Sequence, residues 1–482
     1  MNNICFVFHS KHIQLYMYNC ITAVQELFEN SQIYVFIDET KKSESISFNK
    51  IIQFVDDRFS NYKENPFNSV NLDKLKNIEF ITNFNISKTF DWIVLENEYC
   101  VFNNENFLTK NGFLTLCLDI EFIKKQVLYS DQICLNILYK KTIVNSWLAF
   151  SQSMKCENGI QNNVYKCAFN YSIYLIKLLK NYSFEICLSD YKPSDFKEVG
   201  SFSIFKYYLK LVNKLIKRKL SKEKFNWKIA ILYRNKSFFL NQPANSYWAD
   251  PFIVKKNATT AIFFEELQNN KKGVISCVTL NECFEILEKK IILEKEYHLS
   301  FPYIFEQNDK VFMIPESSAS NSLKIYECIN FPFEWQFHST LIDGIKLIDV
   351  VFVFHENRYW LFANKVHTFE HDNNEKLFLY YSDDLFSGTW QPHIQNPIVT
   401  NAASSRNAGK IYSKNNKLYR VSQNCFDAYG GNIVLNEITI LTTANYSESI
   451  TEEIFAQMNY HGIHTMNFQD DLTIVDYLYK EK

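Results

Sequence analysis

The 482-residue chain is poor in the residues that punctuate loops, with only 10 glycines and 9 prolines. No Walker loop, GxGxxG fingerprint, HExxH pair or nucleophile-elbow motif occurs, so nothing indicates a nicotinamide cofactor or a structural zinc. Aromatic residues, by contrast, reach 16% of the chain. Many aromatics with few glycines and prolines favour strands and well-filled cores.

Charge of one sign and long apolar runs are also lacking. The 51 Lys and Arg residues nearly balance the 53 Asp and Glu residues, which argues against nucleic acid as the main partner. The 12 cysteines form no CxxC pair and no metal-like spacing, so we expect free cytosolic thiols, no metal and no cofactor. No apolar run approaches the ~20 residues of a membrane span, and residues 4–8 predict a first strand rather than a signal peptide. A cytoplasmic protein is therefore expected.

The first part of the chain predicts an α/β domain, residues 1–182, of the Rossmann type with a parallel sheet. Short apolar runs alternate with helical or long segments, which is typical of parallel strands. The predicted strands are 4–8, 32–38, 91–97 and 112–119, and the predicted helices are 15–28 and 162–182.

Residues 183–225 are predicted to be a linker that contains a basic amphipathic helix at 203–220. Its apolar residues are expected to form one stripe surrounded by lysines. One interpretation is a helix packed on a domain, and the other is a helix that rests peripherally on the inner face of an anionic membrane.

After residue 225 one plan repeats five times, an apolar strand, a polar turn and an aromatic strand. The repeats are 250–266, 301–317, 349–364, 408–424 and 464–479. Their starts lie roughly 50 to 60 residues apart, the period of a four-stranded propeller blade. The sequence therefore predicts an all-β five-bladed propeller over residues 226–482.

Several stretches of this propeller resemble a known family, the N-terminal domain of glucosamine inositolphosphorylceramide transferases. They include "WADPFIV…FFEE", "HLSFPYIFEQNDKVFMIPES", "AGKIYSKNNKLYRVSQN" and "GIHTMN", in this order. The family's propeller is in turn similar to those of family-43 and family-32 glycoside hydrolases. The resemblance implies a sugar ligand in the funnel at the centre of the propeller.

Residues 1–182 resemble a degenerate formyltransferase N-terminal domain. That resemblance implies an Asn–His–Asp arrangement for formyl transfer, but no histidine lies between His12 and His298. Asp119 alone matches. We therefore expect the fold without formyltransferase activity.

The resemblance to propeller hydrolases implies carboxylates as the catalytic groups. Asp250 and Asp349 begin the inner strands of the first and third blades, where those enzymes carry a base and an orienting aspartate. The usual Glu-Gly-Pro is replaced here by "SSRNAGKIY", which contains Arg406. Glu316 is the expected substitute acid. For each acid the alternative is ordinary turn or strand-end chemistry.

Binding residues are expected around the same funnel. Arg406 stays protonated and suits a phosphate or carboxylate ligand, and His464 is expected to help hold phosphate. Glu265 and Glu266 must point to opposite faces of their strand, and Glu266 is the preferred one. Further candidates are Gln423, Asn424 and Trp248, although most aromatics are expected to fill blade cores.

These observations predict a carbohydrate-active protein of surface-polysaccharide or glycan biosynthesis. Arg406 in place of an acid favours transfer of a glycosyl or related group from a phosphorylated or nucleotide-linked sugar. The alternatives are a propeller glycoside hydrolase or phosphorylase, and a non-catalytic glycan-binding or scaffold protein. The sequence leaves the oligomeric state open.

Overall fold

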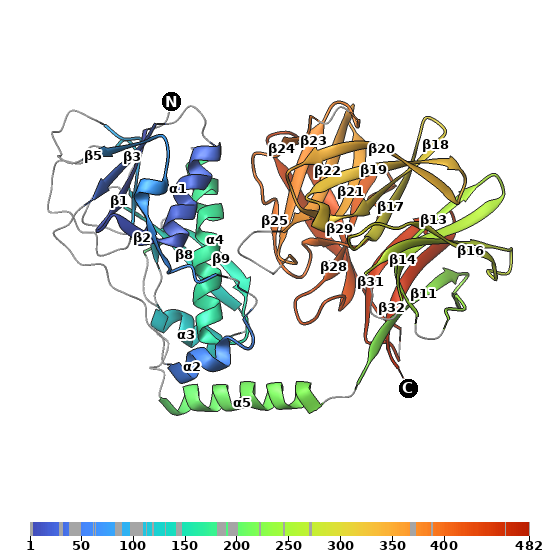
Figure 1. The fold of residues 1–482 in the computed structure, drawn as a ribbon, viewed down its shortest axis with the longest axis horizontal. Helices are drawn as coiled ribbons and strands as arrows, with labels where there is room; N and C mark the ends of the chain where they lie inside the picture. Colours follow the sequence, from blue (N-terminus) through green and yellow to red (C-terminus); the bar gives the residue numbers. More distant parts are fainter. Residues whose placement is uncertain are drawn as a thin grey trace. The chain divides into compact units, whose positions relative to one another are not determined.

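The computed structural model divides into two compact units, residues 1–221 and residues 222–368 with 372–482, and each is described by itself (Figure 1). The structure describes residues 3–27, 32–37, 50–60, 62, 64–81, 89–96, 109–111, 113–117, 120–130, 132–140, 147–180, 189–190, 201–220, 223–243, 246–268, 272–366, 373–386, 389–457 and 459–481. Asp119 lies outside these residues. Within them, no helix has both the length and the apolar character needed to cross a membrane.

The first unit is built on one eight-stranded sheet. Its strands are β1 (Asn3–Phe8), β3 (Gln32–Ile37), β5 (Ile78–Ile81), β6 (Trp92–Leu95), β7 (Phe113–Cys117), β8 (Gln132–Lys140), β9 (Trp147–Lys155) and β10 (Ser189–Asp190). They lie in the order β10-β9-β8-β7-β6-β1-β3-β5, and every pair from β7 to β5 is parallel. The last three strands add antiparallel pairs that the sequence did not predict. A small antiparallel pair, β2 (His12–Gln14) with β4 (Ser69–Asn71), and a 3-10 turn at Leu72–Lys74 complete the strand framework.

Alternation along β1 explains how this sheet is covered. Ile4, Phe6 and Phe8 join a buried cluster with α1 and α4, whereas Cys5 and Val7 join a second cluster on the other face. The helices are α1 (Leu15–Leu27), α2 (Lys50–Asp56), α3 (Ile120–Tyr129), α4 (Ile160–Lys180) and α5 (Ser201–Leu220). The predicted α/β class is confirmed, and the likeness to formyltransferases stays a prediction.

The second unit is the predicted five-bladed propeller. Blade 1 consists of β13 (Ser246–Lys256), β14 (Thr259–Gln268), β15 (Val274–Leu280) and β16 (Ile286–Leu293). Blade 2 consists of β17 (Ser300–Gln307), β18 (Lys310–Glu316), β19 (Ser322–Asn330) and β20 (Glu334–Asp343), with a 3-10 turn at Ser318–Ser320. Blade 3 consists of β21 (Leu347–His355), β22 (Arg358–Lys365), β23 (Lys376–Ser382), β24 (Gln391–Pro392) and β25 (Val399–Thr400).

The last two blades close the ring. Blade 4 consists of β26 (Arg406–Asn407), β27 (Tyr412–Lys414), β28 (Lys417–Asn424), β29 (Asn432–Leu441) and β30 (Tyr446–Phe455). Blade 5 joins β31 (Gly462–Gln469) and β32 (Leu472–Lys480) to β11 (Phe225–Tyr233) and β12 (Lys236–Phe239). Because β11 pairs with β32 from Phe225 to Leu232, strands from the two ends of the propeller sequence share one sheet.

Asparagine replaces glycine in the tight hairpins of the blades. Asn257, Asn308, Asn357 and Asn415 all adopt positive φ angles, between 49 and 60°. Two-residue hairpin turns need this left-handed conformation, and asparagine tolerates it better than other residues with a side chain. The propeller can therefore form its inner hairpins despite the scarcity of glycine.

Candidate active site

Four of the five blades carry the same irregularity in their innermost strand. The pairing register shifts between Ala249 and Phe252, Ser300 and Tyr303, Ile348 and Val351, and Ile463 and Met466. Such bulges redirect side chains. The residues displaced in blades 1, 3 and 5 include Asp250, Asp349 and His464, so one repeated backbone feature presents three of the predicted site residues.

The backbone at these bulges adopts a conformation that residues with a side chain rarely take. The φ angles are 54° at Asp250, 40° at Phe301 and 47° at Asp349. A left-handed conformation at a residue with a bulky side chain is costly and persists only where the surrounding contacts enforce it. At Asp250 those contacts come from two neighbouring blades, 2 and 5.

Both oxygens of the Asp250 carboxylate have partners inside the propeller. Its Oδ1 lies 3.0 Å from His464 Nε2 and accepts a bond of 3.0 Å from the Thr465 hydroxyl, both in blade 5. Its Oδ2 accepts a bond of 3.1 Å from the Phe301 backbone N–H in blade 2. With 6% of its surface exposed, Asp250 joins blades 1, 2 and 5 rather than facing solvent.

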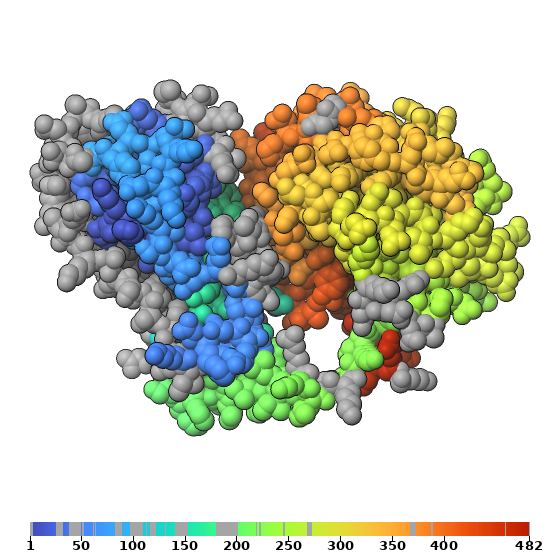
Figure 2. Space-filling view, in the orientation of Figure 1, coloured from blue at the N-terminus to red at the C-terminus, as the bar shows by residue number. Residues whose placement is uncertain are grey.

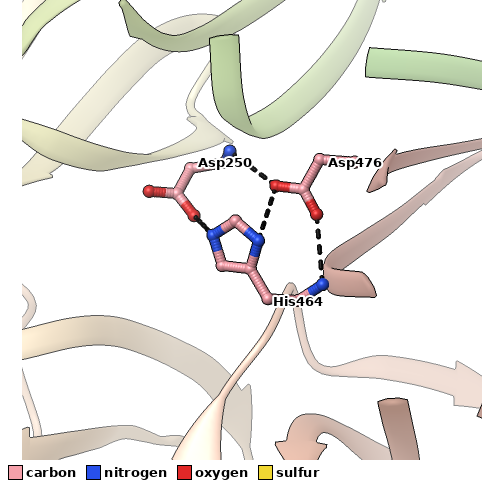
Figure 3. A group of neighbouring side chains, drawn as sticks. All are labelled: Asp250, His464 and Asp476. Carbon is pink, nitrogen blue, oxygen red and sulfur yellow. Dashed lines mark hydrogen bonds and ion pairs between the residues drawn. The ribbon is translucent and has the colours of Figure 1, made fainter. Parts of the chain in front are cut away.

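Asp476, which the sequence did not single out, completes a buried Asp–His–Asp chain (Figure 3). Its Oδ2 lies 3.0 Å from His464 Nδ1 and accepts the Asp250 backbone N–H at 2.9 Å. Its Oδ1 accepts the backbone N–H groups of His464 at 3.2 Å and of Thr465 at 2.9 Å. The imidazole is therefore clamped between two carboxylates from different blades.

This arrangement fixes the charge of the imidazole. Burial alone would lower the pKa of His464, but the flanking Asp476 and Asp250 carboxylates outweigh it and raise that pKa to about 10. Burial likewise opposes ionisation of Asp250, yet the His464 cation holds its pKa below the usual range. The His464 imidazole is thus a cation at neutral pH.

Among the described residues, the same three form a group that could in principle hold a metal ion. One ligand atom from each of Asp250, His464 and Asp476 lies within 4.8 Å of the others. Both imidazole nitrogens, however, already face a carboxylate oxygen, and a metal-bound histidine would have to give up one of these contacts. The residues fit a charged hydrogen-bonded chain better than a metal centre.

A second cluster brings together Glu316, Asp349 and Arg406 from blades 2, 3 and 4. Arg406 Nε pairs with Asp349 Oδ2 at 2.6 Å, and its Nη1 donates to Asn374 Oδ1 at 2.9 Å. Burial and the adjacent Asp349 carboxylate raise the pKa of Glu316 well above its usual range, although Arg406 opposes this. Glu316 is thus an acid whose protonated form is favoured beside an ion pair, with part of its surface exposed.

Tyr429 lies between the two clusters and was not predicted from the sequence. The Arg406 guanidinium sits 4.9 Å from the centre of its ring, and the His464 ring lies 5.3 Å away. Its side chain is 43% exposed, so the ring offers an accessible aromatic surface next to the buried charges. The neighbouring Gly430, at φ 67°, leaves no room for a side chain, since a Cβ there would lie 2.8 Å from His464 Cβ.

The two adjacent glutamates of β14 face opposite sides of blade 1, as expected. Glu265 lies on the Asp250 side and pairs with His298 Nε2 at 3.1 Å, while burial raises its pKa. Glu266 instead accepts bonds from Ser276 and Lys289 on the other face. The preference for Glu266 as the partner of Asp250 is therefore reversed, and Glu265 takes that place.

The remaining predicted residues pack or form hydrogen bonds inside the propeller. Trp248 is 1% exposed and packs 4.5 Å from the Phe264 ring, so it presents no ring face to a sugar. Gln423 bonds the backbone of Asn407, and Asn424 accepts the Phe426 backbone N–H. Both lie on β28, the strand that pairs with β26, and bond within blade 4. His464, clamped between carboxylates, is an unsuitable phosphate ligand.

Comparison with known proteins finds a matching family model and similar plant proteins. The family model described as "Glucosamine inositolphosphorylceramide transferase 1, N-terminal" matches residues 218–468. The proteins named glucosamine inositolphosphorylceramide transferase 1 from Arabidopsis thaliana and Oryza sativa subsp. japonica are 33% and 32% identical over 212 residues, 43% of this chain. That stretch covers 27% and 28% of those proteins, so the chain spans about a quarter of the length of these curated relatives.

Glycoside hydrolases are among the solved structures similar to the chain. One is Zg3597, a family 117 enzyme of Zobellia galactanivorans, with 10% identity, a TM-score of 0.37, and coverage of 53% of this chain and 90% of that one. Another is CoXyl43, a family 43 enzyme from a compost metagenome, with 11% identity, a TM-score of 0.37, and coverage of 50% and 92%. Scores this low carry no statement about substrate or activity.

Proposed function

We propose that the propeller of this chain serves glycan assembly. The premise is that the chain belongs to the family of the glucosamine inositolphosphorylceramide transferase 1 N-terminal domain. In this proposal the propeller transfers a glycosyl or related group from a phosphorylated or nucleotide-linked sugar. The ligand binds beside Glu316, Asp349, Arg406 and Tyr429. The first unit is proposed to keep a formyltransferase-like fold without the histidine that formyl transfer requires.

The observation that carries this proposal is the placement of Glu316, whose pKa is raised by burial and by Asp349, beside the Asp349–Arg406 ion pair. A carboxyl that stays neutral at working pH can donate its proton to a leaving oxygen. Arg406 donates through Nε to Asp349 and through Nη1 to Asn374, while its Nη2 donates no hydrogen bond to any of the described residues. Arg406 therefore keeps donor capacity for a phosphate oxygen.

Asp250 has a positioning role in this proposal rather than that of a base. A base must offer a free oxygen to the proton that it removes, whereas both oxygens of Asp250 already accept hydrogen bonds or face His464. Asp250 instead fixes blades 1, 2 and 5 against one another. This keeps blade 2, which carries Glu316, in place.

A second candidate function is a glycan-binding module without chemistry. The burial of Asp250 and the exposure of Tyr429 favour it, because aromatic rings bind sugars by stacking while buried acids stabilise the blades. The two functions differ in what Glu316 does. In the transferase it gives up a proton, and in the binding module it only keeps the site neutral.

Ligand binding and turnover separate these functions. Thermal shift and calorimetry are measured with nucleotide sugars, sugar phosphates and the corresponding free sugars. Arg406→Ala is expected to weaken binding of the phosphate-containing ligands about tenfold to a hundredfold, as befits a lost hydrogen bond to a charged group. Arg358→Ala is the matched control, since Arg358 forms a surface ion pair with Asp383 at 2.7 Å in the same propeller.

Glu316→Gln tests the chemistry. It is expected to keep ligand binding and to lose transfer to an acceptor glycan, measured by release of the nucleotide or phosphate. Release of free sugar with water as acceptor would identify a hydrolase. Binding without any release by the wild type would identify the binding module, and the absence of ligand-induced stabilisation in the wild type would refute both.

A further inference from the structure

Helix α5 has two apolar faces, and the first unit covers one of them. Tyr207 and Tyr208 accept hydrogen bonds from the backbone N–H groups of Gly159 at 2.9 Å and Ile160 at 3.3 Å. The Tyr208 hydroxyl also donates to Asp56 at 3.0 Å. These contacts at the start of α4 attach the helix firmly to the first unit without involving its other face.

The other face is a continuous stripe of large apolar side chains at the surface. At about 100° per residue, its members lie within about 60° of one another around the helix. They are Phe202, Phe205, Leu209, Ile216 and Leu220, which are 77%, 63%, 50%, 49% and 73% exposed. In Figure 2 the side chains of α5, in green, lie on the visible surface. The single stripe expected from the sequence is thus two faces, one packed and one exposed.

The charged residues of α5 around this exposed stripe are all basic. The helix contains six basic residues and no aspartate or glutamate. Lys206, Lys210 and Lys217 border the stripe on one side, and Lys219 borders it on the other. An apolar stripe flanked by lysines complements a surface that is apolar below and negatively charged above, which describes an anionic bilayer.

We propose that α5 is an interfacial anchor that lies in the plane of an anionic lipid bilayer. The stripe from Phe202 to Leu220 enters the boundary between headgroups and acyl chains, and the flanking lysines contact the lipid phosphates. The packed face, through Tyr207 and Tyr208, transmits this attachment to the first unit. The anchor is independent of the chemistry proposed for the propeller.

Vesicle co-sedimentation of the full chain tests this anchor in the absence of any sugar ligand. The wild type is expected to bind vesicles of phosphatidylcholine mixed with phosphatidylserine, and to bind pure phosphatidylcholine far less. Because each basic residue near such a surface strengthens binding about fivefold, Lys206→Gln with Lys210→Gln should weaken it about twenty-five-fold. Added salt should weaken the wild type in the same direction.

Phe205→Ser with Leu209→Ser removes the centre of the stripe and is expected to abolish binding. Phe455→Ser is the matched control, because Phe455 is 68% exposed on the propeller and should leave binding unchanged. Unchanged circular dichroism and melting of the first unit confirm that the stripe variant folds. Equal binding by the stripe variant, or failure of the wild type to bind anionic vesicles, would overturn the proposal. A wild-type dimer that the stripe variant dissociates would assign the stripe to a second copy instead.

Discussion

Replacing His464 by glutamine should destabilise the propeller more than any change of an exposed histidine. The imidazolium is 2% exposed and is the cation between Asp250 and Asp476, at 3.0 Å from each. Glutamine retains hydrogen-bonding groups but no charge. The variant therefore leaves two carboxylates from blades 1 and 5 buried close together without a cation.

The pKa of His464 gives the size of the effect. It rises from an ordinary value of 6.5 to about 10, and a tenfold change in proton affinity corresponds to about 1.4 kcal/mol. The raised pKa therefore contributes roughly 5 kcal/mol of stability below pH 6.5, which is lost as the pH rises toward about 10. Removing one partner of a buried ion pair costs a similar amount, about 3–5 kcal/mol. We expect His464→Gln to lower the free energy of unfolding of the propeller by about 3–5 kcal/mol.

Urea unfolding followed by tryptophan fluorescence measures this loss. Trp227 is a local reporter, since its ring lies 4.0 Å from the His464 ring. His338→Gln is the control, because His338 is an exposed residue of β20 and should change stability by less than about 0.5 kcal/mol. A loss below about 1 kcal/mol for His464→Gln would refute the charged chain.

The pH dependence provides an independent check with a definite sign. A histidine whose pKa is raised on folding stabilises fully below its ordinary value of 6.5 and loses this contribution as the pH rises toward about 10. The wild type should therefore lose stability over this range relative to His464→Gln. The difference between the two proteins removes the contributions of other groups, and a constant difference across that range would contradict the assignment.

Three further predictions concern groups that the structure places in contact. Gly430→Ala should destabilise the propeller by about 1–3 kcal/mol in the same urea assay. The added Cβ would lie 2.8 Å from His464 Cβ, at a backbone φ of 67°. Unchanged stability would mean that the backbone around residue 430 shifts to make room for the methyl group. Asp349→Asn should lower the pKa of Glu316 by removing the adjacent negative charge, seen as a shift of the protonated carboxyl band in infrared pH titrations; an unmoved titration would show that burial alone sets it. Burial raises the pKa of Asp56 to about 6, so the first unit should lose roughly 3 kcal/mol as the pH rises from about 4 to about 6, where the folded state still holds the proton. Asp56→Asn should remove this slope, and its persistence in the variant would assign it to another group.

The propeller could be read from the sequence because its signals are local. Alternating apolar residues around a polar turn predict each inner hairpin, as in residues 301–317. The number of such repeats predicts the number of blades. The same logic identified α4, whose apolar spacing extends over 21 residues. The antiparallel pairing of β8, β9 and β10 was not predicted, since an apolar pattern does not reveal the direction of strand pairing.

The site was predicted less completely, and for a physical reason. Asp250, Asp349 and Arg406 could be proposed from the resemblance to propeller hydrolases, and the structure brings Asp349 and Arg406 within 2.6 Å. Asp476 gave no signal, because it sits in the middle of β32 and becomes important through contacts with Asp250, 226 residues away. Tyr429 likewise acquires its place only through Arg406 and His464.

The sequence by itself determined the two kinds of domain, the five blades and the positions at which acids could matter, because periodicity and turn chemistry act between near neighbours. Only the tertiary structure decided which groups surround each of these acids. A carboxylate is a base, a positioning group or a protonated acid according to the groups around it, and for Asp250 and Glu316 those groups come from other blades. The two faces of α5 illustrate the same rule, since its apolar spacing was evident but the packing of Tyr207 and Tyr208 alone reveals which face remains exposed.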